Sequence, residues 1–482
     1  MSVVPDLLRL KNIPSNLQQN IETDLLETST FQEATATTGG FARFDLQKKG
    51  WLHSHSKLFL SLIPKAGEAI ATFPPHIGIN SVIQKAVLKI GNQTLNEIDD
   101  WNYLQVIKSA QINNETQVAR EQFTTGRAIA SQYMYRKVNV GGTNTEQSDV
   151  SAVTYGMDNG KDYTLGVAAG VGNNFEGANL LPYACCQLNP ASAATISESP
   201  VYSVDLSDLF PFLKTHSLPL YMIDQQMSIE LHWSPTVDKR VILAGAKAGA
   251  LSSSYVIDRN ELKFCADYVF YTDSDLMLRY KEANPRIEFS FPDYRLSKST
   301  ASHTQIASGL VSNLGMANRL CSRVLTILCN DAGTDQTLLG PYSALAPNMD
   351  AAGVTGAISY NIRYNDRFEF PVSLSNKARL FSLFTQSEGL PFVTRKQYSN
   401  DGNGGLTPFN YLNNKAQNTG LEGNLFFLAT RLTSGRVGVR GIELHYSAQG
   451  MTNLAAGYTI RSYMEYARLA VLEGGLFSVF NA

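Results

Sequence analysis

The sequence predicts an all-β fold with two tandem eight-stranded jelly-roll barrels (a double jelly roll), accompanied by short helices and long surface loops. Three observations predict this fold. Short runs of period-two alternation recur along the chain, a strand-like sequence of one half recurs in the other, and the 22 Tyr and 23 Phe against 3 Trp suit the faces of β-sheets. Because the repeat divides the chain into two similar parts, each part is expected to form one barrel.

The predicted strands begin at residue 41, where the spacing of apolar residues changes from helical to alternating. Residues 41–46 form the first strand, 57–63 form a second that ends at Pro64, and 82–90 form a third that runs into a turn at 91–92. The later candidates are short, rich in Val, Ile, Tyr and Phe, and bounded by Gly, Pro, Asn or Asp. They lie at 201–206, 218–223, 227–233, 262–271, 286–291, 321–329, 358–363, 378–384, 424–431, 437–446 and 458–471.

The internal repeat is the most informative feature of the chain. The sequence IELHWS at 229–234 recurs as IELHYS at 442–447, an offset of 213 residues. A loop and an aromatic strand follow each copy, at 264–271 in the first case and at 462–469 in the second. Two related units of roughly 200 residues would each hold about eight strands, which is the number in a jelly roll.

The change of period and the repeat divide the chain into three predicted parts. Three stretches rich in Gly, Asn, Ala, Ser and Thr, at 139–180, 330–357 and 397–423, interrupt the barrels and are expected to lie together on one exposed end. The predicted parts are an N-terminal arm at 1–40, a first jelly roll at 41–275 and a second jelly roll at 276–482.

A short amphipathic helix is predicted in the arm at 16–27. Ser15 is a good N-cap, and Leu17, Ile21 and Leu25 recur every four residues on one helix face. Two interpretations of this helix stay open. It packs on its own domain, or the arm reaches a neighbouring subunit or an underlying layer.

The composition excludes several classes of protein. The chain has 482 residues, and 40 basic against 42 acidic side chains leave a net charge of −2, so charge gives no support for binding nucleic acid or an anionic membrane. A hydrophobic content of 44% excludes wholesale disorder, and a charged content of 17% fits a surface that is largely covered. No apolar run approaches the length of a transmembrane helix, and charged residues interrupt the leucines of the N-terminus, so no signal peptide is expected.

The five cysteines do not suggest a disulfide framework. Cys185 and Cys186 are adjacent, Cys265 stands alone, and Cys321 and Cys329 lie at the two ends of one predicted strand. No C-x-x-C spacing suggests zinc or redox chemistry, so a reducing compartment is expected.

No catalytic, metal-binding or cofactor-binding residue is predicted, and the protein is not expected to be an enzyme. The Walker A, complete G-x-G-x-x-G, H-E-x-x-H and G-x-S-x-G motifs are all missing from the sequence. His53 and His55 could begin a metal site, but without a third ligand at a suitable spacing an exposed or core pair is favoured. His232 and His445 occupy the same place in the two repeats, which favours a structural role.

Two pairs of acidic residues could also be read as catalytic carboxylates. Asp99 with Asp100 and Asp273 with Asp275 lie close together in the sequence. Turn and helix-capping roles explain these pairs equally well, and paired acids alone do not identify a glycosidase.

Several segments of the chain together form a recognisable series. They are LKIGNQTLNEIDDWNYL at 88–104, VDLSDLFPFLKTHSLPL at 204–220, DYVFYTD at 267–273, YNDRF at 364–368 with LFSLF at 380–384, and YARLAVLEGGLFS at 466–478. In this order, along residues 80–480, they resemble segments of the double jelly-roll major capsid proteins of large eukaryotic DNA viruses, virophages and polinton-like viruses, a family that carries no catalytic residues. The chain departs from the family in a single glycine at Gly91 where the family has a pair, and in the short charged run at 278–281.

The resemblance implies a major capsid protein that forms trimeric, pseudo-hexagonal capsomers of an icosahedral virion shell around a DNA genome. The partners that it implies are two further copies of the chain, neighbouring capsomers, penton and minor capsid or cement proteins, and an inner membrane reached through the arm. Sequence-specific nucleic-acid binding is not expected. The implied location is the virion, after synthesis in the host cytoplasm. The alternatives are a minor or vertex virion component, and a two-jelly-roll carbohydrate-binding protein or enzyme.

Overall fold

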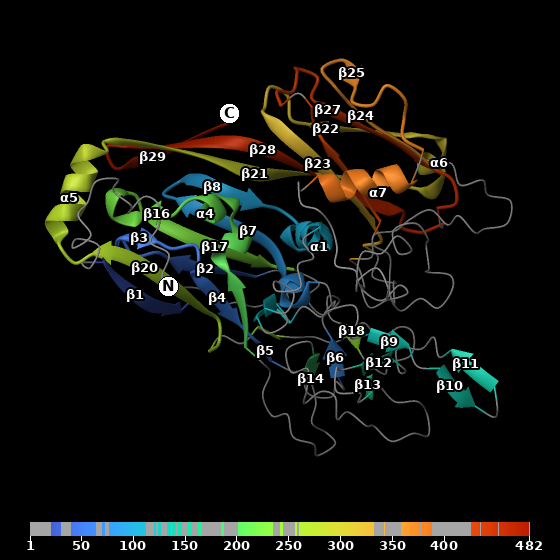
Figure 1. The fold of residues 1–482 in the computed structure, drawn as a ribbon, viewed down its shortest axis with the longest axis horizontal. Helices are drawn as coiled ribbons and strands as arrows, with labels where there is room; N and C mark the ends of the chain where they lie inside the picture. Colours follow the sequence, from blue (N-terminus) through green and yellow to red (C-terminus); the bar gives the residue numbers. More distant parts are fainter. Residues whose placement is uncertain are drawn as a thin grey trace.

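The structure is a computed structural model, and Figure 1 shows its two barrels. It describes residues 21–29, 40–63, 70–72, 77–111, 120–121, 124–126, 133–135, 137–140, 143–146, 153–156, 162–165, 185–187, 201–234, 242–243, 256–257, 260–331, 342, 358–375, 377–387, 426–433, 435–451 and 453–481.

The first barrel consists of two antiparallel sheets. In one sheet β20 is central, with β1 on one edge and β4 and β3 on different stretches of the other edge. The second sheet has the order β2-β17-β7-β8. The bounds are β1 (Ile21–Ser29), β20 (Lys263–Tyr271), β3 (Trp51–Leu52), β4 (Lys57–Leu60), β15 (Tyr202–Asp205), β16 (Leu218–Pro219), β2 (Phe41–Asp45), β17 (Met227–Trp233), β7 (Ile83–Ile90) and β8 (Gln93–Ile98).

The second barrel repeats this plan. One sheet has the order β21-β28-β23-β26, with β29 as a hairpin partner of β28, and the other has the order β22-β27-β24-β25. The bounds are β21 (Arg286–Ala301), β28 (Tyr458–Glu473), β23 (Cys321–Cys329), β26 (Phe427–Arg431), β29 (Leu476–Asn481), β22 (Leu310–Gly315), β27 (Ile442–Ala448), β24 (Ile358–Tyr364) and β25 (Arg367–Phe368).

The internal repeat lies at equivalent positions in the two barrels. The repeated segments form β17 and β27, each second in its four-stranded sheet, and the aromatic strands form β20 and β28. Strand for strand, β1-β20-β4-β15 corresponds to β21-β28-β23-β26, and β2-β17-β7-β8 corresponds to β22-β27-β24-β25. Each barrel therefore has eight principal strands, and the predicted double jelly roll is confirmed.

The predicted helix at 16–27 is wrong for the part that the structure describes. Residues 21–29 form β1, which pairs in register with β20 from Ile21 opposite Tyr271 to Ser29 opposite Lys263. Leu26 packs against the core while Leu25 points outward, as the alternation of a strand requires. The free edge of β20 offers a full row of backbone partners, and this tertiary pairing overrides the helical spacing of the leucines. Residues 16–20 lie outside the described residues.

The predicted strand at 378–384 is also wrong, because α7 (Lys377–Gln386) is a helix. Leu380 and Phe384 are both buried, and their spacing of four residues places them on one helix face. Phe384 stacks on Phe427 of β26, with ring centroids 5.0 Å apart. A short apolar run of this kind fits the period of a helix as well as that of a strand, and here packing against β26 favours the helix.

The remaining elements are short and connect or cover the barrels. Of the three predicted loops, 397–423 lies outside the described residues, 330–357 is described only at 330–331 and 342, and 139–180 contains short strands that were not predicted. These elements are η4 (Gly78–Val82), α1 (Trp101–Gln111), α3 (Leu206–Leu209), α4 (Pro211–Thr215), η8 (Leu220–Met222), α5 (Ser274–Ala283), α6 (His303–Ser308), β5 (Leu62–Ile63), β6 (Ile70–Thr72), β9 (Tyr133–Tyr135), β10 (Lys137–Val140), β11 (Thr143–Glu146), β12 (Val153–Gly156), β13 (Asp162–Leu165), β14 (Cys185–Gln187), β18 (Ile242–Leu243) and β19 (Val256–Ile257).

The core runs through both barrels. In the first barrel Phe44 of β2 and Phe264 of β20 face each other across the two sheets, with ring centroids 5.9 Å apart. In the second barrel the hydroxyl groups of Tyr360 and Thr430 join β24 to β26 at 2.7 Å. The buried apolar side chains of both barrels form one continuous cluster, so the hydrophobic core links the two barrels. Among the helices of the described ranges, none is long and apolar enough to cross a membrane.

Candidate functional site

The two barrels meet along a buried contact that we call the barrel joint. Figure 1 shows β21, β28 and β29 extending from the second barrel across β8 and α4 of the first. The joint consists of an arginine cluster, an aspartate cluster and an aromatic cluster. Its residues are Ser81, Thr94, Leu95, Asn96, Asp100, Asn102, Tyr103, Phe212, His216, Asp224 and Gln225 from the first barrel, with Phe289, Ser290, Phe291, Asp293, Lys298, Asp331, Tyr342, Arg461, Tyr463, Tyr466, Arg468, Gly475 and Phe477 from the second half of the chain.

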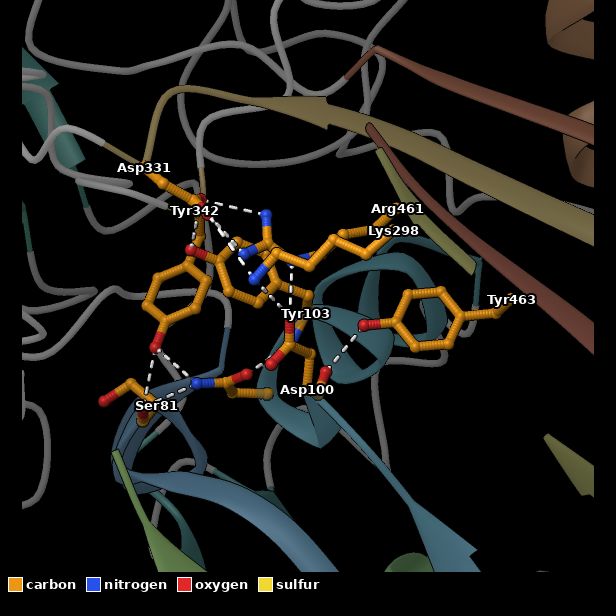
Figure 2. Close-up of polar contacts among 9 residues, drawn as sticks. Ser81, Asp100, Tyr103, Lys298, Asp331, Tyr342, Arg461 and Tyr463 are labelled. Atoms are coloured by element: carbon orange, nitrogen blue, oxygen red, sulfur yellow. Dashed lines mark hydrogen bonds and ion pairs between the residues drawn. The ribbon is translucent and has the colours of Figure 1, made fainter. Parts of the chain in front are cut away.

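Arg461 of β28 is the centre of the arginine cluster (Figure 2). Its Nε donates to Oδ2 of Asp100 at 2.7 Å, and its two terminal nitrogens donate to the carboxylate of Asp331 at 2.9 and 2.6 Å. The guanidinium lies 3.6 Å from the ring centroid of Tyr103 in α1. A fork-shaped cation thus binds one carboxylate from each half of the chain and stacks on an aromatic ring.

Further hydrogen bonds fix the acids and rings of this cluster. Lys298 lies 3.3 Å from Asp100, and the Tyr103 hydroxyl donates to Asp331 at 3.1 Å. The Tyr463 hydroxyl donates to the backbone oxygen of Asp100 at 2.7 Å, and Tyr342 donates to the backbone oxygen of Ser81 at 2.6 Å. Figure 2 shows these side chains converging from both barrels.

The charges and hydrogen bonds of the cluster favour the ionised forms of its two carboxyl groups, Asp100 and Asp331. Burial raises the pKa of Asp100, but attraction to and hydrogen bonds from Arg461 and Lys298 outweigh it, so the net pKa is lowered. Burial acts in the same way on Asp331, and hydrogen bonds from Arg461 together with its charge lower the net pKa. The buried charges are therefore compensated within the joint, which is the condition for a buried ion pair to be tolerated.

Asp293 of β21 is the centre of the aspartate cluster. Its carboxylate accepts hydrogen bonds from Asn96 of β8 at 3.0 Å, from Arg468 at 2.8 Å and from the Tyr466 hydroxyl at 3.3 Å. Arg468 also donates to the backbone oxygen of Leu95 at 2.9 Å. Burial nevertheless raises the pKa of Asp293 to about 6, since its loss of hydration outweighs the attraction of Arg468.

An aromatic cluster completes the joint. Phe212 of α4 contacts Phe291 and Phe289 of β21 with ring centroids 5.0 and 5.5 Å apart, both edge to face. Phe477 of β29 stacks on Phe289 at 5.9 Å. The backbone N–H of Asp224 donates to the backbone oxygen of Gly475, where the β28–β29 turn touches the first barrel. The joint therefore combines apolar burial with directional polar contacts, which fixes the orientation of one barrel against the other.

The histidines of the sequence analysis lie outside the joint. His53 and His55 lie in a turn and not on a strand, and the backbone N–H of His55 donates to Nδ1 of His53 at 3.1 Å. His232 and His445 have matching environments, because Nε2 of each lies near a glutamate two residues earlier, at 3.9 Å from Glu230 and 3.3 Å from Glu443. In the described residues no three His, Cys, Asp or Glu side chains are grouped so that they could hold a metal ion.

The acid pairs have separate roles. Asp273 caps α5 by accepting a hydrogen bond from the backbone N–H of Asp275 at 2.9 Å, as the capping interpretation predicted. Asp99 forms an exposed ion pair with Lys85 at 3.1 Å, whereas Asp100 is buried in the joint. Sequence reasoning did not identify Asp100, Asp293 and Arg461 as joint residues. A charged residue inside a strongly apolar strand, such as Arg461, was the signal that could have indicated them.

The described cysteines are not paired with one another. Cys265, Cys321 and Cys329 are buried, and none of the three forms a disulfide bond with another described cysteine. Burial raises the pKa of Cys321 to about 12, so its thiol stays protonated and unreactive at neutral pH. The side chains of Cys185 and Cys186 lie outside the described residues.

Comparison with known proteins identifies the fold. No protein-family model matches the chain, and no curated protein matches it. In the structure of the Sputnik virophage by cryo-EM, a chain with 11% identity aligns with a TM-score of 0.54 over 100% of this chain and 93% of that chain. In the quasi-atomic model of the PBCV-1 virus capsid, a chain with 10% identity aligns with a TM-score of 0.50 over 96% of this chain and 97% of that chain. With two barrels of equal strand order, this chain has the double jelly-roll fold.

Proposed function

We propose that the chain is the major capsid protein of an icosahedral virus, the repeating subunit of the virion shell. The observation that carries this proposal is the barrel joint, which holds two barrels of the same strand order in one fixed orientation. The similarity to a chain of the PBCV-1 virus capsid supports it. A subunit of a shell functions through its shape and its contacts with other subunits, and the ionised groups of the joint hold the two barrels together.

The proposed capsomer is a homotrimer. Two similar barrels per chain give six barrels around a threefold axis, which makes a nearly hexagonal block from a subunit with no sixfold symmetry. Hexagonal blocks tile the faces of an icosahedral shell. A joint that lets the two barrels rotate freely would not give a block of constant outline, so a rigid joint suits this function.

We keep the predicted boundary between the two barrels at residues 275 and 276. The predicted arm at 1–40 is not separate throughout, because β1 (Ile21–Ser29) pairs with β20 as a strand of the first barrel. Neighbouring capsomers, penton proteins, minor capsid or cement proteins and an inner membrane are the proposed partners, and the virion is the proposed location.

Light scattering of the purified protein tests this function. At low micromolar concentration the measured mass should be that of three chains, because obligate interfaces commonly bury more than about 2,000 Å² and resist dilution. A pentamer would favour a vertex component of the virion. A monomer that never assembles at any concentration would contradict the proposal.

A further inference from the structure

Three connections between strands lie at one end of the second barrel, which we call the basic end. In the strand ladders Ile442 at the start of β27 lies opposite both Gly315 at the end of β22 and Tyr364 at the end of β24. The connections that meet there therefore leave the barrel on the same side. They are the β22–β23 connection at 316–320, the β24–β25 turn at 365–366 and the β26–β27 connection at 432–441, of which residue 434 lies outside the described residues.

Hydrogen bonds hold the three connections together. The backbone N–H of Asn318 donates to the oxygen of Val437 at 3.0 Å, and the N–H of Val437 donates to the oxygen of Arg319 at 2.9 Å. The side-chain amide of Asn365 donates to the backbone oxygen of Arg436 at 2.9 Å. Both shorter connections are thus bonded to the longest one, so the three form one surface whose shape is set before any partner binds.

Positive charge predominates on this surface. Asp366 pairs with Arg440 at 2.9 Å, yet these side chains remain 67% and 73% exposed. The other nearby acid, Glu369, accepts hydrogen bonds from the hydroxyl groups of Tyr364 and Thr433. Against these two acids stand five arginines, which are Arg319, Arg436 and Arg440 in the connections and Arg367 and Arg431 at the adjoining strand ends. Although the whole chain has a net charge of −2, this end attracts an anionic partner.

Aliphatic side chains protrude among the arginines. Val439, beside Arg440, is 80% exposed, and Leu320, which forms a β-bridge with Arg436, is 42% exposed. Gly441 has a positive φ of +78°, and a Cβ there would lie 2.3 Å from the backbone oxygen of Gly315, so the connection packs closely on β22 and turns outward. Exposed aliphatic groups and arginines side by side make an amphipathic surface, which suits the boundary between lipid headgroups and acyl chains.

We infer that the basic end binds an anionic lipid surface, with the arginines at the headgroup phosphates and Val439 and Leu320 against the upper acyl chains. A lipid is favoured over a nucleic acid because single-stranded nucleic acids stack their bases on free aromatic rings, and the exposed ring of Phe368 in β25 already packs edge to face on His445 at 5.0 Å. This inference rests on the proposed function for the inner membrane and names the surface that contacts it. A trimer presents three such ends, so weak contacts of single copies combine.

Flotation with lipid vesicles tests the inference. Vesicles of phosphatidylcholine that contain phosphatidylserine should carry the purified wild type upward in a density gradient, whereas vesicles of phosphatidylcholine alone should not. Raising the salt concentration from about 0.1 M to about 1 M should release the protein, because the Debye length falls from about 10 Å to about 3 Å. A wild type that stays at the bottom with both kinds of vesicle would overturn the inference.

Two variants with matched controls locate the contact. Arg436→Glu and Val439→Asp should each lower the partition coefficient for the phosphatidylserine vesicles by roughly tenfold or more, since every copy of the trimer is affected. Arg295→Glu, at an exposed position within β21, is the control for the first variant. Val311→Asp is the control for the second, because Val311 is 60% exposed and lies near the other end of β22. Both controls should float like the wild type, and equal flotation of Val439→Asp and Val311→Asp would contradict a lipid contact.

Two further measurements separate this inference from its alternatives. If a short DNA duplex displaces the protein from the vesicles, and Val439→Asp binds that duplex as tightly as the wild type does, the basic end is a nucleic-acid surface and the inference is overturned. Light scattering of the same samples reports on the proposed function. A trimer that binds no vesicles would overturn the lipid contact alone, whereas a monomer that binds them would overturn the proposed capsomer and leave the lipid contact standing.

Discussion

The two barrels have the same strand order but place their equivalent residues in different surroundings. Arg461 of the second barrel is buried among two carboxylates and an aromatic ring, whereas its counterpart in the repeat, Lys263 of the first barrel, forms a partly exposed pair with Glu27 at 3.7 Å. Asp293 and Asp24 lie opposite the aligned residues Tyr466 and Tyr268, and they differ in the same way, with 2% and 42% of their side chains exposed. Equivalent positions in the same fold therefore do not contribute equally to stability. Their contribution depends on whether the other barrel covers the side chain.

Removing the cation at each equivalent position should give the largest contrast. Arg461→Ala leaves Asp100 and Asp331 in the joint without their shared partner, and breaking a buried pair in this way costs about 3 to 5 kcal/mol. Lys263→Ala removes a partly exposed pair and should cost less than about 1 kcal/mol. Urea unfolding of both variants measures the two free energies. Equal losses would show that Arg461 does not hold the joint.

A second contrast concerns the equivalent aspartates. Asp293→Asn keeps the shape of the side chain, but its amide group must face either Asn96 or Arg468, so one of these buried donors loses its acceptor and the fold should be destabilised by about 1 to 3 kcal/mol. Asp24→Asn removes only the exposed pair with Lys49 and should change the free energy of unfolding by less than about 1 kcal/mol. Thermal unfolding at neutral pH compares them. If Asp24→Asn were the less stable of the two variants, the assignment of Asp293 as the aspartate that stabilises the joint would be wrong.

The pH dependence of Asp293 sharpens this contrast. Its pKa of about 6 in the fold lies above the ordinary value for the unfolded chain, about 3.9. The proton on Asp293 therefore stabilises the fold fully below about pH 4, and this contribution is lost as the pH rises through about 6. The free energy of unfolding of the wild type, relative to Asp293→Asn, should fall between about pH 4 and pH 6. Urea unfolding across this range measures it, and a relative free energy that rises instead would show that the folded pKa is lowered.

The smallest expected effect concerns the turn where β28 and β29 touch the first barrel. Gly474 and Gly475 both have positive φ, +57° and +82°, so alanine is strained at either. A Cβ on Gly475 would lie 2.0 Å from a carboxylate oxygen of Asp224, whereas nothing lies within 4 Å of one on Gly474. Gly475→Ala should therefore cost about 1 kcal/mol more than Gly474→Ala. Equal melting temperatures for the two variants would mean that Gly475 does not closely contact Asp224 of the first barrel.

The sequence predicts the strands of the barrels well, because their alternation is a local property. The predictions at 227–233 and 321–329 match β17 and β23 to the residue. The sequence-based prediction is wrong at β1 and α7, where the spacing of the apolar residues fits both a helix and a strand. Pairing with β20 makes the first a strand, and packing on β26 makes the second a helix. Single-sequence patterns contain no information about such partners.

The joint was harder to predict than the barrels. Asp100 could be read only as a turn or cap residue, since its partner Arg461 lies 361 residues away along the chain. Local spacing cannot show that a carboxylate and a guanidinium this distant will meet. The repeat did indicate two equivalent barrels, but it carried no signal of where one barrel rests on the other.

Electron microscopy of the purified protein in negative stain tests the central claim most directly, because it shows the number and arrangement of barrels in one particle. Three chains with rigid joints should give particles with six similar lobes around a threefold axis and a nearly hexagonal outline. Two-lobed particles in which the angle between the lobes varies, or rings with five lobes, would contradict the capsomer and the rigid joint on which it depends.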